Sequence, residues 1–252
     1  MLAEGQSVDV EAFWGAGFLQ GRYRPGAISW TWPEVVRPLL TRATRLLDMG
    51  TGEGGVLAGL APLPPVTVAY EEWPPTIPAA RDTLRPLRVH LVQTRGSLEN
   101  AGHPGIDDRP ALPFAASAFD VVLSRHEAFD PADVARITRA GGVFLTQQVG
   151  SDEAASVRSL FDLPIDAPVW DARVAVSQLE SAGWRIADVR EERTLSEFTD
   201  IGALIAYVRS LPWAYPDLDV HRALPRLRRL HDQSRVRPIP AVSHRFLVRA
   251  HR

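Results

Sequence analysis

The sequence predicts an α/β fold: a Rossmann-like sheet of seven mostly parallel strands with helices on both faces, an N-terminal helical segment, and a helical insertion before the last strand. Three observations predict it. Short apolar runs alternate with helical stretches from Arg45 onward, which is typical of βαβ units. A glycine-rich loop follows the first run. Residues 191–243, a stretch of roughly fifty, separate the last two runs, too many for a connector without structure of its own.

The expected elements follow from the spacing of apolar residues and from the proline and glycine residues that mark where helices begin and end. Strands are expected at the short apolar runs Arg45–Met49, Val66–Glu71, Val89–Gln93, Phe119–Ser124, Val143–Gln148, Trp184–Arg190 and His244–Ala250. Helices are expected between them at Gly54–Leu60, Ile77–Leu84, Pro131–Arg139 and Asp171–Ala182. Pro131 suits the first turn of a helix, and Gly183 suits the end of one.

The length of 252 residues and the 45% apolar content predict one globular domain, 1–252. Two helices are expected near the N-terminus, Val8–Gln20 and one that starts near Pro33. In the insertion, Thr199 is the expected N-cap of a helix through Val208, and Leu218–His231 is a second helix. The expected regions are an N-terminal cap at 1–44, a core at 45–192, the insertion at 193–243 and the last strand at 244–252.

Two absences in the composition exclude several kinds of chemistry. The chain has no cysteine, which excludes disulfides, thiolate metal sites, iron–sulfur clusters and a cysteine nucleophile. All 28 basic residues are arginine, so a lysine Schiff base and a P-loop lysine are excluded too. No metal site is expected. There is no apolar run long enough to span a membrane and no signal-peptide pattern at the start, so we expect a cytoplasmic protein without membrane association.

The segment Asp48–Gly55, with the sequence Asp-Met-Gly-Thr-Gly-Glu-Gly-Gly, joins the first core strand to a helix. Its glycines allow a sharp turn and a close approach by a ligand. Two carboxylates, Asp48 and Glu53, would repel a pyrophosphate but suit an ammonium or a sulfonium. Glu71 ends the next strand, where an acid can bind both hydroxyls of a ribose. Trp73 is either a stacking partner for an adenine or a core residue.

These motifs resemble those of the class I S-adenosylmethionine-dependent methyltransferases, and most closely a type 11-like bacterial group. The resemblance covers residues 46–148. It includes the glycine loop and Glu71, then Leu112-Pro113-Phe114, Phe119-Asp120-Val121-Val122 and Gly141-Gly142. Arg125-His126-Glu127-Ala128 and Thr146-Gln147-Gln148-Val149-Gly150 carry the resemblance to the bacterial group.

The resemblance implies S-adenosylmethionine as cofactor, with S-adenosylhomocysteine as product. The acid that usually follows the family's third strand is displaced here by a longer loop, which leaves Asp107 or Asp108 for the adenine amino group. The residues implied in cofactor binding are Asp48, Gly50, Thr51, Gly52, Glu53, Gly54, Glu71, Trp73, Asp108 and Leu112.

The candidate catalytic residues follow the fourth strand, at the edge where open α/β sheets bind ligands. His126 is the candidate base, because imidazole titrates near neutral pH, with Glu127 to orient it. The alternative is that His126 only fixes the loop. Arg125 is expected to hold a carboxylate of the cofactor or the acceptor, and one of Gln147 and Gln148 to bond a polar acceptor group.

The leading hypothesis is O- or N-methylation of a small molecule by a monomer or homodimer. The alternatives are an RNA or protein methyltransferase and a non-methylating S-adenosylmethionine-binding protein. Nucleic acid is not favoured, since the net charge is −2, although 221–252 contain nine arginines against one acid. A nicotinamide oxidoreductase is disfavoured by the acids of the glycine loop.

Overall fold

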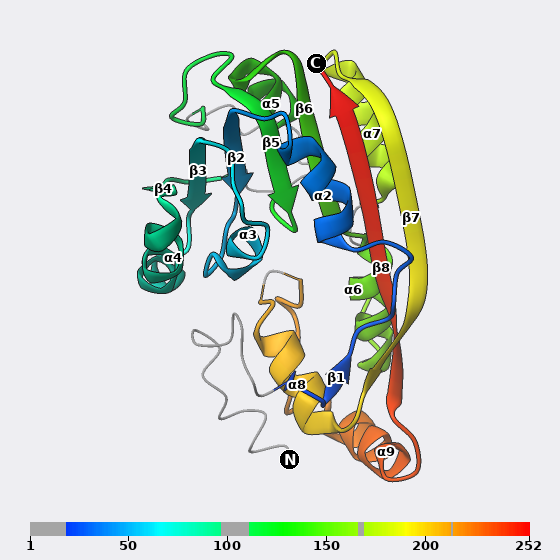
Figure 1. Cartoon of the computed structure of the whole chain (residues 1–252). Coiled ribbons are helices and arrows are strands. Elements are labelled where there is room, and N and C mark those ends of the chain that lie inside the picture. The colour runs from blue at the N-terminus through cyan, green and yellow to red at the C-terminus, as the bar shows by residue number, and fades with distance from the viewer. Residues whose placement is uncertain (1–18, 97–110, 166–168, 213) are drawn as a thin grey trace. The chain divides into compact units, whose positions relative to one another are not determined.

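A computed structural model describes residues 19–96, 111–165, 169–212 and 214–252 (Figure 1). Its strands are β1 (Tyr23–Arg24), β2 (Arg45–Met49), β3 (Val66–Glu71), β4 (His90–Gln93), β5 (Phe119–Arg125), β6 (Thr138–Val149), β7 (Arg185–Phe198) and β8 (Ile239–His251). Its helices are α2 (Trp32–Leu40), α3 (Gly55–Ala58), α4 (Ile77–Leu84), α5 (Pro131–Ile137), α6 (Ser151–Leu160), α7 (Ala172–Ser181), α8 (Ile201–Arg209) and α9 (Leu224–Ser234). The expected α/β class with a mostly parallel core is confirmed, with eight strands instead of seven.

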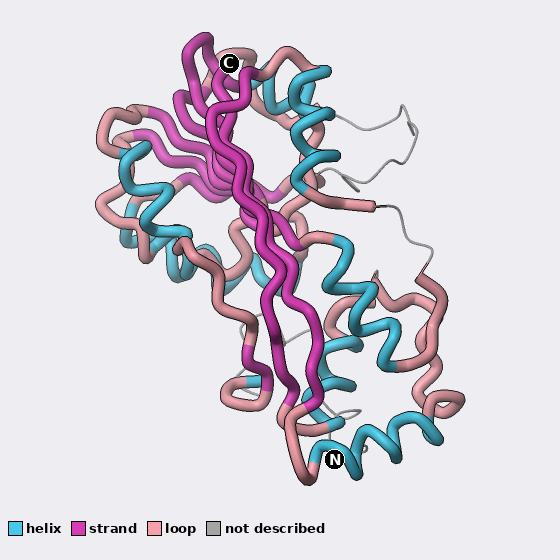
Figure 2. The backbone as a smooth tube through the Cα atoms, turned by 90° about the vertical axis from the view of Figure 1, so that its right-hand side faces the viewer, coloured by secondary structure: helices cyan, strands magenta, loops and turns pink. Residues whose placement is uncertain are grey.

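The chain divides into two compact units. The larger unit comprises Ser29–Val149, Pro168–Glu191 and Arg245–Arg252, and the smaller comprises Met1–Ile28, Gly150–Ala167 and Glu192–His244. The long strands β7 and β8 contribute residues to both (Figure 2). The expectation of a single domain, 1–252, stays a prediction.

In the larger unit the strands follow the order β7-β8-β6-β5-β2-β3-β4. The pairs from β6 through β5, β2 and β3 to β4 are all parallel, and β8 runs antiparallel to β6. The main hydrophobic core includes strand residues such as Leu47, Val122 and Phe144 and side chains of α5 and α7. Because neighbouring parallel strands end at the same edge, the loops after β2, β3 and β5 lie near one another.

The smaller unit has its own core, formed by α6, α8, α9 and the parts of β7 and β8 that belong to it. The short strand β1 pairs with the end of β7, where Tyr23 stacks on Phe198 at 4.8 Å between ring centroids. Among the described residues, no helix is both long and apolar enough to span a membrane.

The insertion differs from its predicted form in three ways. Residues 193–198 and 239–243 continue β7 and β8, so the insertion is only partly helical. The N-cap of α8 is Asp200, not Thr199, because the Asp200 carboxylate accepts bonds from the backbone N–H groups of Gly202 and Ala203. The last helix of the insertion, α9, starts and ends later than the predicted Leu218–His231.

Two further elements differ from the predictions, and a third predicted element lies almost entirely outside the described residues. Helix α6 was not expected, since few apolar residues mark it. The predicted Pro131–Arg139 helix ends at Ile137, because the chain enters β6 at Thr138. The predicted helix Val8–Gln20 lies, except for its last two residues, outside the described residues.

Candidate active site

The loop after β2 has a backbone that only glycine adopts without strain. Gly50, Gly52 and Gly54 have φ values of 61°, 59° and 79°. A Cβ on Gly50 would lie 2.5 Å from a carboxylate oxygen of Glu127, and one on Gly54 would lie 2.7 Å from Leu84. At Gly52 a Cβ would meet nothing within 4 Å. Gly50 and Gly54 are therefore required by packing, whereas Gly52 leaves open space beside the loop.

Glu71, the last residue of β3, ties its strand to this loop. Its Oε2 accepts a bond from the Gly52 N–H at 2.6 Å, and its Oε1 accepts bonds from the N–H groups of Glu72 and Trp73 at 3.0 and 2.9 Å. Since a carboxylate accepts about four hydrogen bonds, these three leave about one position, on Oε2, for a ligand hydroxyl. The side chain is buried and has little rotational freedom.

The neighbouring residues divide into exposed and buried groups. Trp73 is 45% exposed, so it is not a core residue, and the stacking role remains the prediction for it. Glu53 is exposed. The Thr51 hydroxyl is buried with no hydrogen-bond partner among the described residues. Leu112 is buried, and its N–H donates to Asp133 at 2.6 Å.

Asp107 and Asp108, the candidates for the adenine contact, lie outside the described residues. Their predicted role therefore stays a prediction.

Two carboxyl groups near the loop are hard to ionise. Burial raises the pKa of Asp48 to about 7, with a smaller contribution from Glu71. Burial and the negative charges of Glu72 and Glu71 raise the pKa of Glu127 to about 8. The Glu127 carboxyl packs against Gly50 and Gly96. A cation bound here would favour the ionised form of both acids.

His126 takes part in a chain of hydrogen bonds whose direction can be read. The Trp30 indole N–H donates to Oε1 of Gln147 at 2.9 Å, and Nε2 of Gln147 lies 3.3 Å from Nε2 of His126. Because an indole only donates, Gln147 must present its oxygen to Trp30 and its NH2 group to His126. Nε2 of His126 therefore accepts, which describes a neutral imidazole with its proton on Nδ1.

The electrostatics around His126 agree with a neutral ring. Desolvation of the ring by neighbouring atoms, together with the positive charges of Arg125 and Arg245, lowers the pKa of His126 well below its usual range. The residue as a whole is nevertheless exposed. The residue has a φ of 65°, an uncommon value outside glycine. With Nε2 engaged by Gln147, these features favour a positioning role for His126 over that of a general base.

Glu127 does not contact His126 as expected from the sequence, and of the two candidate glutamines Gln148 is the one that faces away from His126. Gln148 donates to the Glu127 carbonyl at 2.9 Å and to Thr146 Oγ1 at 2.7 Å, so it fixes the turn after β5. Gln147 is the glutamine on the His126 side. Glu127 packs against the glycine loop, and within the described chain no hydrogen bond joins it to His126.

Sequence reasoning missed Arg245 on β8. Burial and the charge of Arg245 lower the pKa of Arg125, while Asp48 raises it. The Nε of Arg125 is buried and has no hydrogen-bond partner in the described part of the chain. No local signal in the sequence relates Arg245 to Arg125, because the pairing of β8 with β6 is what brings them together.

Comparison with known proteins gives matches to solved structures. YcgJ from Bacillus subtilis has 15% identity and a TM-score of 0.59, with 87% of this chain and 97% of that chain covered. A Bacillus halodurans protein described as a candidate methyltransferase has 16% identity and a TM-score of 0.57, covering 87% and 96%. The [4+2]-cyclase SpnF has 16% identity and a TM-score of 0.56, covering 98% and 95%. No family model and no curated protein matches the sequence.

These likenesses establish the class I methyltransferase fold, as the sequence motifs predicted. At such low identity they do not identify a reaction, and a cyclase shares the fold. The reaction must be argued from the site itself.

Proposed function

We propose that this protein is an S-adenosylmethionine-dependent methyltransferase that acts on a small-molecule acceptor by O- or N-methylation. The observation that carries the proposal is the Glu71 carboxylate, buried and bonded to Gly52 of the glycine turn. This arrangement fits the ribose of an adenosine beside a loop that a ligand can approach closely. Asp48 and Glu127, both with raised pKa values, suit a cationic ligand.

The residues present fit the ribose, the adenine and the methionine end of the cofactor in turn. Glu71 would accept a ribose hydroxyl, and the exposed Trp73 would stack on the adenine. The open space at Gly52 admits the ligand beside the backbone. Asp48, Glu53 and Glu127 would complement the positively charged methionine end.

When bound, the cofactor supplies an electrophilic methyl group on a sulfonium, and the protein's task is alignment and charge stabilisation. The acceptor oxygen or nitrogen forms the new bond to carbon while the carbon–sulfur bond breaks and its electron pair stays on sulfur. The acceptor loses a proton, if it carries one, to solvent or to a nearby base. A neutral His126 with its proton on Nδ1 can orient the acceptor by donating a hydrogen bond.

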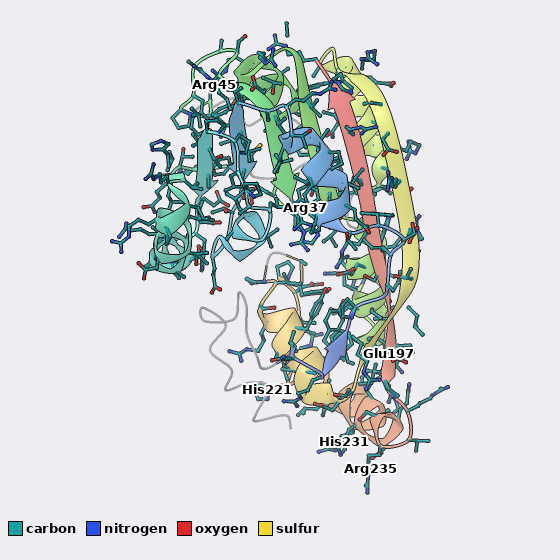
Figure 3. All side chains as sticks on the ribbon, viewed as in Figure 1. Arg37, Arg45, Glu197, His221, His231 and Arg235 are labelled. Carbon is teal, nitrogen blue, oxygen red and sulfur yellow. The ribbon has the colours of Figure 1, made fainter. Side chains whose placement is uncertain are left out.

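The RNA alternative depends on the C-terminal arginines. Arg226 and Arg229 on α9 lie 3.8 and 3.9 Å from Asp162, which partly neutralises that helix. Figure 3 labels His231 on α9 and Arg235 just after it. Arg245 and Arg249 lie instead on β8 in the larger unit. The arginines of 221–252 therefore belong to two units. No observation within either unit favours RNA, and the small-molecule acceptor remains our proposal.

The proposed function is tested first by binding. Calorimetry with S-adenosylmethionine, S-adenosylhomocysteine and NAD should show binding of the first two and not of NAD. Incubation with methyl-labelled S-adenosylmethionine and a metabolite extract should then give a labelled small molecule in the mass spectrum. Cofactor binding without any labelled product would favour a non-methylating protein, and the absence of cofactor binding would refute the proposal.

A further inference from the structure

We propose that Tyr70 is a positioning residue of the cofactor site, whose hydroxyl binds the Glu127 carboxylate once the positive charge of the cofactor has displaced the proton of that carboxyl. The displaced proton passes to solvent, so the bound cation and the ionised carboxyl form a neutral pair. This coupling rests on the proposed function, and it makes Tyr70 a determinant of the pH at which the cofactor binds.

The strand register brings Tyr70 and the turn of Glu127 together. Tyr70 on β3 pairs with Met49 on β2, and Met49 pairs with Ser124 on β5. Paired residues of neighbouring strands share a face of the sheet. Glu127 follows Ser124 by three residues, and its backbone carbonyl accepts bonds from Ser124 Oγ and Gln148 Nε2, each at 2.9 Å. The turn that carries Glu127 is therefore fixed at the ends of these strands.

Two glycines leave room for the Glu127 carboxyl. A Cβ on Gly50, after β2, would overlap its Oε2, and a Cβ on Gly96, after β4, would overlap its Oε1. The Cβ on Gly96 would also lie 3.1 Å from the Tyr70 hydroxyl. The carboxyl and the hydroxyl therefore approach the same point of the backbone at Gly96.

The Tyr70 ring holds its hydroxyl at this point. The side chain is fully buried and belongs to the main hydrophobic core of the larger unit. Among the described residues the hydroxyl makes no hydrogen bond of normal geometry, although it lies close enough to Glu127 to act on that carboxyl as a donor. Because an ionised carboxyl accepts a stronger hydrogen bond than a neutral one, ionisation of Glu127 should complete this bond.

The other titratable groups that act on this pair are acids. Burial, followed by the charges of Glu72 and Glu71, raises the pKa of Glu127 to about 8, and the Tyr70 hydroxyl opposes that rise. Burial and the surrounding acids, which include Asp48, raise the pKa of Tyr70 well above its usual range. Tyr70 therefore keeps its proton and remains a donor, while Glu127 holds a proton near neutral pH that a bound cation would displace.

The basic residues that precede Glu127 in the chain act elsewhere. Arg125 favours the ionised form of Asp48 and the neutral form of His126. Within the described ranges, the charged and polar groups that act on Glu127 are two acids and Tyr70, and none of them is basic. An ionised Glu127 therefore requires a positive charge from a ligand, which the methionine end of the cofactor would supply.

The first test counts the protons that binding releases. The whole chain is titrated with S-adenosylhomocysteine at pH 7.5 in phosphate and in Tris, whose ionisation enthalpies differ, and calorimetry then gives the number of protons released. The wild type should release about 0.5–1 proton, because a carboxyl with a pKa of about 8 is mostly protonated at that pH. Glu127→Gln should release less than half as many.

The second test separates the role of Tyr70 from a merely structural one. Relative to the wild type at the same pH, Tyr70→Phe should weaken S-adenosylhomocysteine binding about tenfold at pH 7.5 and less than twofold at pH 9.5. At the higher pH Glu127 is ionised before the ligand binds, so the lost bond affects the free and the bound chain about equally. When Glu127→Gln is already present, Tyr70→Phe should change the affinity less than twofold at both pH values.

Tyr207→Phe is the matched control, because the Tyr207 hydroxyl donates to another buried carboxylate, that of Glu153, at 2.7 Å in the smaller unit. It should leave the affinity and the proton count within twofold of the wild type, and thermal unfolding checks that each variant is folded. The inference is overturned if the wild type binds the ligand without releasing a proton. It is also overturned if Tyr70→Phe has no effect or weakens binding by the same factor at both pH values, or if Tyr207→Phe gives the same pH-dependent loss.

These outcomes differ from a failure of the proposed function. If the wild-type chain does not bind S-adenosylhomocysteine at either pH, the proposed function is refuted and the role of Tyr70 is refuted with it. Binding that does not depend on Tyr70 in the expected way refutes the role of Tyr70 alone.

Discussion

The two sides of the candidate site in the larger unit have opposite charge. The acidic side consists of Asp48, Glu71, Glu72 and Glu127, next to the glycine loop. The basic side consists of Arg125 and Arg245, at the edge of β5, β6 and β8. The acidic side suits the cationic cofactor that we propose. The contrast shows that two groups of opposite charge lie along the same edge of one sheet.

One short turn supplies both sides. Arg125 and Glu127 are two residues apart, yet Arg125 interacts with Arg245 while Glu127 packs against Gly50 and Gly96. The positive φ of His126, between them, turns the backbone and is held by the bond from the His126 N–H to the Gln147 carbonyl at 2.8 Å. An uncommon backbone conformation at this point thus has a structural explanation.

The largest effect on cofactor binding is expected from Gly50→Ala. Its methyl group would collide with the Glu127 carboxylate and would be held at a positive φ. Displacement of the loop by about 1 Å should weaken S-adenosylhomocysteine binding about 100-fold, and the unfolding free energy should fall by about 1–3 kcal/mol. Calorimetry and urea unfolding measure the two quantities.

Gly52→Ala is the control for that clash, because its φ is similar but its Cβ would meet nothing within 4 Å. It should cost less stability than Gly50→Ala. Equal losses would mean that backbone strain, and not the contact with Glu127, dominates.

The next largest effect is expected from Glu71→Gln. The amide keeps the shape but loses the charge that strengthens the bonds from Gly52 and Trp73. Loss of a charged hydrogen bond worth about 1.5–3 kcal/mol should weaken cofactor binding about 10- to 100-fold. Glu53→Gln, on an exposed side chain, should have a much smaller effect. A dissociation constant for S-adenosylhomocysteine equal to that of the wild type would contradict the proposed contact between Glu71 and the ribose.

A smaller effect is expected from pH. As Asp48 and Glu127 ionise, with pKa values of about 7 and about 8, affinity for the cationic S-adenosylmethionine should rise about tenfold between pH 6 and pH 8.5. The stability of the free chain should change in the opposite direction. Both pKa values are raised by folding, so the protonated groups favour the folded state at low pH, and that contribution is lost as pH rises through about 7 to 8.

Glu127→Gln tests the assignment of this pH dependence. The amide cannot ionise, so the variant should show a flatter pH dependence of both affinity and unfolding free energy. An unchanged dependence would show that Glu127 is not the titrating group.

The smallest effect on cofactor binding is expected from Trp30→Phe. The change removes the N–H that orients Gln147, which frees the Gln147 amide to reverse. S-adenosylhomocysteine affinity should change less than twofold, while nitrogen NMR of His126 should show a shift away from the Nδ1-protonated form. If the wild-type ring carries its proton on Nε2, the hydrogen-bond directions inferred here are wrong.

Local patterns in the sequence predicted the central elements well. The strands Arg45–Met49 and Val66–Glu71 and the helix Ile77–Leu84 have the predicted bounds. Here periodic apolar residues and breaking residues act together over a few positions. Helix α6 was missed because its buried face includes Glu153 and Arg158, whose burial depends on partners such as Tyr207 and Asp217.

The sequence by itself determined the fold class, the glycine loop with Asp48 and Glu71, and the turn at Arg125–Glu127, because each is a local arrangement of residues with fixed chemistry. Only the tertiary structure decided what that turn does. Strand register brought Arg245 to Arg125 from a point 120 positions later in the chain, and packing placed Glu127 on the glycine loop. Pairing between distant strands depends on the whole sheet, so no local pattern records it.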